Sequence, residues 1–143
     1  MSTNILEGKW TYRSFINNPV QVSGDAQKAL ALIFGEGELT ITVTSPTLFR
    51  ATLDFGGGSG MDLFGEIVAG AGVNPDVLIM TGTGRAGTGT EGWVYQYKGY
   101  VVPQWSEAVN QVPTIVGTTI RTIPHNGQPA GLTASVVIVR EAS

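Results

Sequence analysis

The chain contains no cysteine and only one histidine, His125. Without cysteine there are no disulfides, no thiolate metal ligands and no cysteine nucleophile. A single imidazole also excludes a zinc or haem site that needs two histidines. We therefore expect no metal and no cofactor. Chemistry in this protein would have to use aromatic rings, hydroxyls, guanidinium groups and carboxylates.

Charge is also sparse, because charged residues make up 13% of the chain and the formal net charge is -3. The usual charged share is about 25%. The eight Lys and Arg residues are scattered singly, whereas binding to nucleic acid phosphates needs a basic patch. The composition therefore argues against a nucleic-acid partner and suits a closed sheet with an apolar interior.

Long apolar runs are absent. The longest, residues 132–139, is broken by Thr133 and Ser135, and a membrane helix needs about 20 apolar residues. Residues 1–8 lack the basic and apolar regions of a signal peptide. We expect no membrane contact and a cytoplasmic location. The length fits a single domain over residues 1–143.

Glycine, by contrast, is abundant, with 20 residues, about twice the average share. The glycines separate segments rich in β-branched and aromatic residues, a pattern typical of short strands joined by turns. It predicts eight strands, at residues 9–16, 38–44, 48–55, 61–68, 76–82, 92–102, 114–123 and 131–141.

Residues 25–34 are ambiguous. Asp25 can cap a short helix with apolar residues on one face, whereas Leu30, Leu32 and Phe34 alternate as in a strand. We favour a short helical or irregular segment.

Eight closely spaced strands with no long crossover helix predict antiparallel, up-and-down neighbours. An open sheet would leave two unpaired edges, and closure removes them. The expected fold is therefore an all-β, eight-stranded antiparallel up-and-down barrel. At this strand number the interior is either filled by side chains or holds one small ligand.

The first predicted strand begins near Gly8-Lys9-Trp10, and the last ends near Arg140. This arrangement resembles the calycin superfamily, the lipocalins and avidin-like proteins, in which an arginine of the last strand packs across the tryptophan of a Gly-x-Trp motif. The resemblance implies a calycin-like barrel with Trp10 and Arg140 in contact. The lipocalin Thr-Asp-Tyr turn and the avidin biotin-binding pattern are absent, so biotin binding is not implied.

Residues 82–87 have the letters of a dinucleotide fingerprint, Gly-Thr-Gly-Arg-Ala-Gly. That motif works only where a strand leads through it into a helix. Here more turn residues and then a strand follow, so a loop is the better interpretation.

Aromatic side chains share one face of the sixth predicted strand, at Trp93, Tyr95 and Tyr97. We favour this face inside the barrel, where it would line a cavity together with Tyr12. The alternative is an outward face that forms a homodimer or higher homo-oligomer. Trp105 lies in an aperiodic connection at residues 103–113, which predicts either a lid over the pocket or plain surface packing.

Three charged or titratable residues are further candidates. Arg121 shares a face with apolar residues of the seventh strand and can act as an interior cation that anchors a carboxylate or enolate. Glu66 is its candidate buried partner, or a base with a raised pKa. For each of the two taken singly, a solvent-facing side chain is the favoured alternative. His125 is most simply a solvated turn residue. The alternative is a ligand-contact or catalytic residue in a loop at the barrel mouth, where it would act as a general acid or base.

These residues support three hypotheses. The first is a barrel that binds a small, mostly apolar ligand, with Arg121 as polar anchor and Trp105 at the mouth. The second is a cofactor-free lyase, isomerase or hydrolase acting on a small carbonyl compound, in which Arg121 stabilises an oxyanion and Tyr97, Glu66 or His125 moves the proton. The third is a structural or oligomerisation protein.

Overall fold

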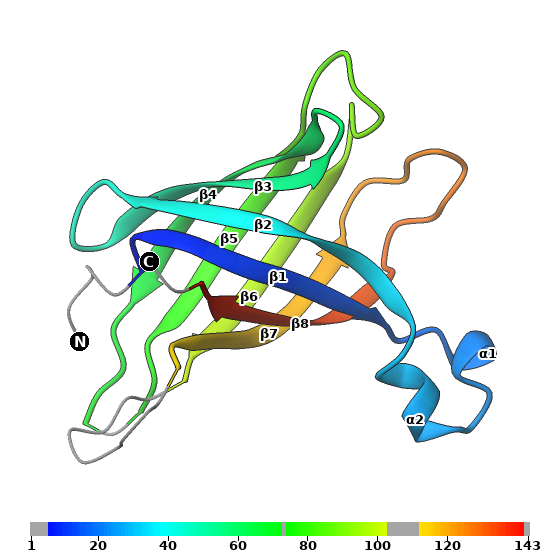
Figure 1. Cartoon of the computed structure of the whole chain (residues 1–143), viewed down its shortest axis with the longest axis horizontal. Coiled ribbons are helices and arrows are strands. Elements are labelled where there is room, and N and C mark those ends of the chain that lie inside the picture. Colours follow the sequence, from blue (N-terminus) through cyan, green and yellow to red (C-terminus); the bar gives the residue numbers. More distant parts are fainter. Residues whose placement is uncertain (1–5, 73, 103–111, 142–143) are drawn as a thin grey trace.

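The computed structural model describes residues 6–72, 74–102 and 112–141. Eight strands there form one antiparallel sheet that closes on itself, in sequence order around the barrel (Figure 1). The expected eight-stranded up-and-down barrel is confirmed. The strands are β1 (Gly8–Ile16), β2 (Ile33–Val43), β3 (Leu48–Gly56), β4 (Ser59–Val68), β5 (Val77–Gly84), β6 (Val94–Val101), β7 (Thr114–Arg121) and β8 (Thr133–Arg140).

The strand boundaries follow the sequence pattern closely except in β2. The other seven strands start and end within two residues of their expected positions. β2 begins at Ile33 rather than at residue 38, because its first half pairs with the second half of β1, up to Phe15 opposite Ile33. Gly35 and Gly37 interrupt the apolar alternation in this half and hide the strand from a pattern search.

Two short helices, α1 (Pro19–Val22) and α2 (Ala26–Ala29), connect β1 to β2. Asn18 caps α1, and Asp25 caps α2 by accepting a hydrogen bond from the Gln27 backbone N–H at 3.0 Å. Residues 25–34 thus contain both expected features, a short capped helix and then the start of a strand. None of the helices in the described ranges is long and apolar enough to cross a bilayer.

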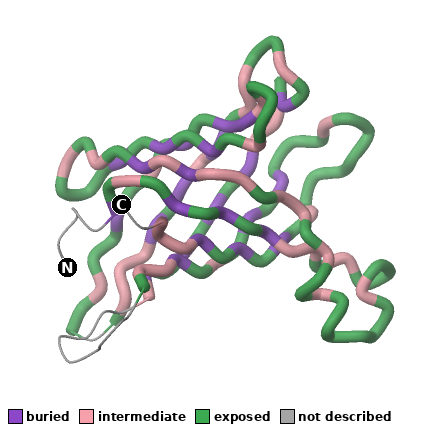
Figure 2. Tube along the Cα trace, in the orientation of Figure 1, coloured by how far each residue is buried: buried purple, intermediate pink, exposed green. Residues whose placement is uncertain are grey.

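Side chains alternate between the interior and the surface along every strand, as Figure 2 shows by the alternating burial colours. In β6, for example, Tyr95 and Tyr97 are buried, whereas Gln96 and Lys98 are exposed. The buried residues form one apolar cluster inside the barrel. Residues that point inward therefore either fill this core or face whatever space remains within it.

One end of the barrel is filled by Trp10, which is fully buried. Its Nε1 donates a hydrogen bond to the Leu6 carbonyl at 2.9 Å. Trp10 pairs with Arg140 across the β1–β8 seam, and the guanidinium lies 5.6 Å from the centre of the indole ring system. A Cβ on Gly8 would lie only 2.8 Å from Arg140 Nη2, so the glycine leaves room for the guanidinium. The predicted contact between Trp10 and Arg140 is confirmed.

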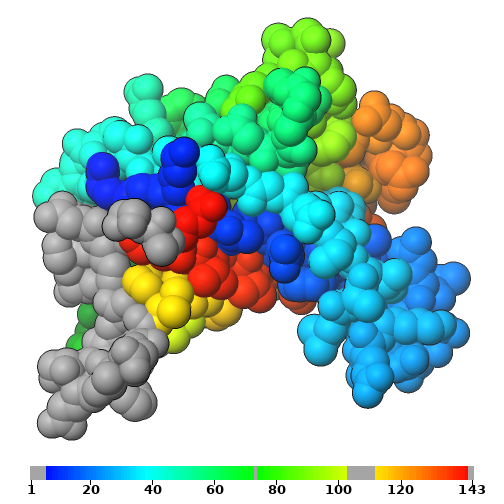
Figure 3. Space-filling view, in the orientation of Figure 1, coloured from blue at the N-terminus to red at the C-terminus, as the bar shows by residue number. Residues whose placement is uncertain are grey.

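The other end carries the helical segment and two projecting loops, which stand apart in the space-filling view (Figure 3). The β5–β6 loop is held to the β3–β4 hairpin. Arg85 forms an ion pair with Asp54 at 2.8 Å, and the buried Thr90 hydroxyl donates to the Gly60 carbonyl at 2.7 Å. No helix follows residues 82–87, where β5 ends at Gly84 and turns follow. The loop interpretation of the fingerprint letters is confirmed.

Candidate functional site

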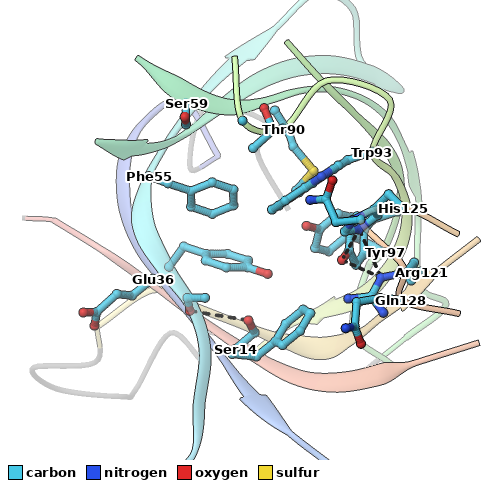
Figure 4. Close-up of a pocket in the computed structure, with 17 residues that line it drawn as sticks. Ser14, Glu36, Phe55, Ser59, Thr90, Trp93, Tyr97, Arg121, His125 and Gln128 are labelled. Atoms are coloured by element: carbon cyan, nitrogen blue, oxygen red, sulfur yellow. Dashed lines mark hydrogen bonds between the residues drawn. The ribbon is translucent and has the colours of Figure 1, made fainter. Parts of the chain in front are cut away.

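A cavity of about 560 Å³ lies inside the barrel at the end opposite Trp10 (Figure 4). Six of the aromatic side chains of the chain surround it, together with one arginine and one histidine. The lining residues are Tyr12, Ser14, Phe34, Gly35, Glu36, Phe55, Ser59, Met61, Gly89, Thr90, Trp93, Tyr95, Tyr97, Arg121, His125, Asn126 and Gln128.

The aromatic face of the sixth strand points inward. Tyr95 and Tyr97 are 3% and 4% exposed, and Trp93, just before β6, also lines the cavity. The alternative in which this face forms an oligomer interface is therefore wrong for the two tyrosines. The physical reason is register, since the pairing of Tyr95 with Arg121 and of Tyr97 with Thr119 turns all four residues to the barrel interior.

Arg121 ends β7 and is 4% exposed, so the solvent-facing alternative is wrong for this residue. Its Nε atom lies 3.0 Å from the Tyr95 hydroxyl oxygen and 3.1 Å from His125 Nε2, so these two acceptors share the single Nε proton. Nη1 donates to the Pro129 carbonyl at 3.2 Å. All of these acceptors are neutral groups. The guanidinium is held in one place without its charge being balanced by any of them.

His125 reaches the cavity because of the turn that follows it. Asn126 and Gly127 both have positive φ, 49° and 74°, which is the conformation of a tight two-residue hairpin turn. His125 and Gln128 exchange two backbone hydrogen bonds across this turn. The imidazole stacks on Trp93 with ring centroids 4.5 Å apart and planes 16° from parallel. It is thus a partly buried wall residue and not a fully solvated turn residue.

The neighbours of His125 define its protonation. Arg121 Nε–H and the Tyr95 hydroxyl both lie within hydrogen-bond distance of Nε2, at 3.1 and 3.0 Å, which fits a lone pair on that nitrogen in the neutral imidazole. Desolvation and, secondly, the positive charge of Arg121 lower the pKa of His125 below its ordinary value of 6.5. The imidazole is therefore neutral at pH 7, and Arg121 is the cation of the cavity wall.

Tyr12 and Tyr97 form the deeper wall, with ring centroids 6.3 Å apart in an edge-to-face arrangement. Burial raises the pKa of the Tyr12 phenol. Burial raises the pKa of Tyr97 well above its ordinary value, and the neighbouring Tyr12 adds to this. Both phenols are neutral at pH 7 and serve as hydrogen-bond donors. Because its phenolate form is essentially unpopulated at pH 7, Tyr97 is not available as a base.

Two other candidates lie elsewhere. Glu66 is exposed on the outer face of β4, next to Phe64 and Val68, which are also exposed. Its assignment as a buried partner of Arg121 is therefore wrong. The register of β4 turns the face shared by Phe64, Glu66 and Val68 outward, although two of these three residues are apolar. Trp105 and most of the predicted lid at residues 103–113 lie outside the described residues. The predicted lid connects β6 to β7. These strands pair next to it at Val101 and Ile115, whereas Tyr95 and Arg121 pair at their other end.

The sequence interpretation did not single out several wall residues. Ser14 and Phe55 follow the same alternation as Tyr12 and Leu53 along β1 and β3, so the strand pattern contained the signal for both. Phe34 belongs to the half of β2 that glycines obscure. Thr90 and Gln128 come from loops, and strand periodicity gives no signal for them.

In the part of the chain that the structure describes, no three side chains of the metal-binding types His, Cys, Asp and Glu come together. The fold and the site together define the molecule as a closed antiparallel β-barrel with an internal, aromatic-walled pocket. Comparison with known protein families, characterised proteins and solved structures finds no match to this chain.

Proposed function

We propose that this protein is a calycin-like binding protein that holds a small, mostly apolar molecule in the cavity of its barrel. The observation that carries the proposal is the 560 Å³ cavity itself, which opens at one end of the barrel and is walled by aromatic rings. Clefts of about 300–1,000 Å³ with apolar walls and a few fixed polar groups are typical of small-ligand sites. The Gly8, Trp10 and Arg140 arrangement supports the calycin-like assignment.

The chemistry of the wall supports an apolar ligand. Phe34, Phe55 and Trp93 surround the outer part of the cavity, and their rings present apolar surface to its contents. Burying apolar ligand surface there contributes roughly 25 cal/mol per Å² before the costs of association. Arg121, Tyr95 and His125 form a single polar group of side chains on one side, which would orient the ligand.

Binding of a neutral apolar dye tests this proposal. N-phenyl-1-naphthylamine gains fluorescence in apolar surroundings, and we expect saturable binding at one site per chain. The variant Gly35→Leu should abolish it. Gly35 lines the cavity, and a Cβ there would make ordinary contacts, the nearest 3.4 Å from Ser14 Oγ, so the added side chain fills the cavity without a backbone clash.

The matched control is Thr42→Leu, which places the same side chain on the exposed outer face of β2. It should leave dye binding unchanged. If the wild type does not bind the dye, or if Gly35→Leu binds it as well as the control does, the proposed function is wrong.

A second candidate, a cofactor-free enzyme for small carbonyl compounds, has one observation in its favour. A neutral imidazole nitrogen lies 3.1 Å from the guanidinium of Arg121, so a proton acceptor adjoins a group that stabilises an enolate oxygen. In this scheme the substrate carbonyl oxygen takes over the hydrogen bond from Arg121, and the freed lone pair of His125 Nε2 takes a proton from the carbon next to the carbonyl. The imidazolium exchanges that proton with solvent and returns a deuteron to the same carbon.

Proton NMR in D₂O tests the enzyme candidate, with phenylpyruvate as the probe. Faster loss of its methylene signal with wild-type protein than with His125→Gln would support an enzyme. Equal rates for the wild type, His125→Gln and buffer would rule this reaction out and leave the binding function.

A further inference from the structure

We propose that the ligand is an aromatic monocarboxylate whose carboxylate binds the guanidinium of Arg121. This inference rests on the proposed binding function and names the chemical class of the molecule bound. It is carried by the buried cation in the cavity wall, by the absence of an acidic partner for it among the described residues, and by the aromatic rings that extend from it.

The charge of Arg121 is not neutralised by any described residue. The ion pairs of the described ranges involve the cations Lys9, Arg13 and Arg85, all on the outside of the barrel or in a loop. Arg121 instead contacts a phenol, an imidazole and a carbonyl. A buried charge without a counter-ion is costly, and an anionic ligand would remove that cost on binding.

The carboxylate nearest to this role is Glu36, the acidic side chain among the lining residues. It forms an ion pair with Arg13 at 3.3 Å, and its side chain is 62% exposed. Figure 4 shows Glu36 on the side of the cavity opposite Arg121, with its carboxylate pointing outward. It does not neutralise Arg121, so the counter-charge would come from the ligand.

The guanidinium is also oriented for an anion. Nε and Nη1 donate to Tyr95, His125 and Pro129, whereas Nη2 donates no hydrogen bond within the described ranges. Arg121 lines the cavity, so Nη2 is the part of the fork left for a ligand. A guanidinium fixed in this way loses little conformational entropy when a carboxylate binds.

The aromatic part of the inference comes from the surrounding rings. The guanidinium carbon lies 5.7 Å from the Tyr95 ring centroid and 5.9 Å from that of Phe34. Beyond them Trp93 and Phe55 face the same cavity with their centroids 6.4 Å apart. A planar ring attached to the carboxylate would lie among these side chains in offset or edge-to-face contact.

Displacement of bound N-phenyl-1-naphthylamine by three matched compounds at pH 7.5 tests the inference. The compounds are 2-naphthoate, the neutral 2-naphthamide, and the saturated decahydronaphthalene-2-carboxylate. We expect 2-naphthoate to bind at least about tenfold more tightly than the amide, because it gains a charge-assisted hydrogen bond. The saturated acid should bind about threefold or more weakly than 2-naphthoate, because it lacks ring–ring contacts.

Two variants assign the effect to Arg121. Arg121→Met keeps much of the side-chain volume but removes the charge, and should bring the affinities for acid and amide within about threefold of each other. Arg121→Lys keeps the charge and should retain a preference for the acid. The comparison of the three compounds on wild-type protein stands even if neither variant folds.

Different negative results contradict the binding function, the carboxylate and the aromatic part of the ligand. If the dye does not bind, the proposed function itself is wrong. If the dye binds but the amide displaces it as well as 2-naphthoate does, or neither displaces it, the carboxylate inference is overturned and the binding function stands. If the saturated acid binds as tightly as 2-naphthoate, the aromatic part of the inference is wrong.

Discussion

Two tryptophans at opposite ends of the barrel differ in their surroundings. Trp10 is fully buried and its Nε1 is hydrogen-bonded to the Leu6 carbonyl. Trp93 is partly buried and stacks on His125, and its buried Nε1 has no partner among the described residues. Unpaired buried polar groups are rare in folded proteins, and this one lies beside the cavity that Trp93 lines. Trp10 therefore acts in stability, whereas Trp93 belongs to the site.

Truncation of Trp10 should destabilise the barrel strongly. Trp10→Ala removes a fully buried indole and should lower the free energy of unfolding by about 3–5 kcal/mol. Tyr100→Ala, an aromatic truncation at a residue 44% exposed, should cost less than about 1 kcal/mol. Urea denaturation measures both. Equal losses in the two variants would contradict the structural role given to Trp10.

The lowered pKa of His125 gives stability a defined dependence on pH. The unfolded imidazole binds a proton near its ordinary pKa of 6.5, and the folded one only at lower pH. This contribution to stability is therefore fully present above pH 6.5 and is lost as the pH falls through the folded pKa. Between roughly pH 7.5 and pH 5.5 the Tm of the wild type should fall more than that of His125→Gln. Parallel curves would show that His125 does not titrate in this way.

The sequence predicted the wall tyrosines and Arg121, but it missed other wall residues both on strands, such as Ser14 and Phe55, and in loops, such as Thr90. Tyr12, Tyr95 and Tyr97 were predicted to line the cavity, because period-two alternation fixes which residues share a face. Arg121 was on the correct face, but its burial depended on closure and register. The position of His125 depends on the turn at Asn126 and Gly127, which redirects the chain after β7.

The β5–β6 loop contributes directly to the cavity wall. It begins after Gly84, and Trp93 at its end lines the cavity. A Cβ on Gly84 would lie 1.5 Å from the Thr90 carbonyl oxygen, so the loop packs directly on this glycine. The Arg85 ion pair with Asp54 and the hydrogen bond from Thr90 to Gly60 hold it to the neighbouring hairpin.

Substitution of Gly84 should therefore displace this loop. Gly84→Ala should lower the free energy of unfolding by about 1–3 kcal/mol, and the environment of Trp93 should change with it. Gly89→Ala in the same loop is the control, because a Cβ there meets only Ser59 Oγ at 3.8 Å. Tryptophan fluorescence and thermal denaturation report both effects. A neutral Gly84→Ala would contradict the packing described.

The elements as a whole were predictable because strand and turn signals are local. Seven strands were placed within two residues, since glycines and alternating side chains mark their ends. The first half of β2 was missed because pairing with β1 overrides its weak local pattern at Gly35 and Gly37. Tertiary pairing of this kind cannot be detected in a short sequence window.

For the whole molecule, closure determines where a ligand can enter. β1 pairs with both β2 and β8, which removes the sheet edges. Trp10 and its neighbours fill one end, and the cavity occupies the other. The sequence predicted closure from the strand number, but it left open whether an eight-stranded interior is filled or hollow. That depends on the combined volume of inward side chains from all eight strands.

A crystal structure of the protein with 2-naphthoate would locate the ligand directly. We expect one molecule inside the barrel, its ring among Phe34, Phe55 and Trp93, and its carboxylate about 2.7–2.9 Å from Nη2 of Arg121. A cavity that stays empty at saturating ligand, or a ligand bound only on the outer face of the sheet, would contradict this expectation.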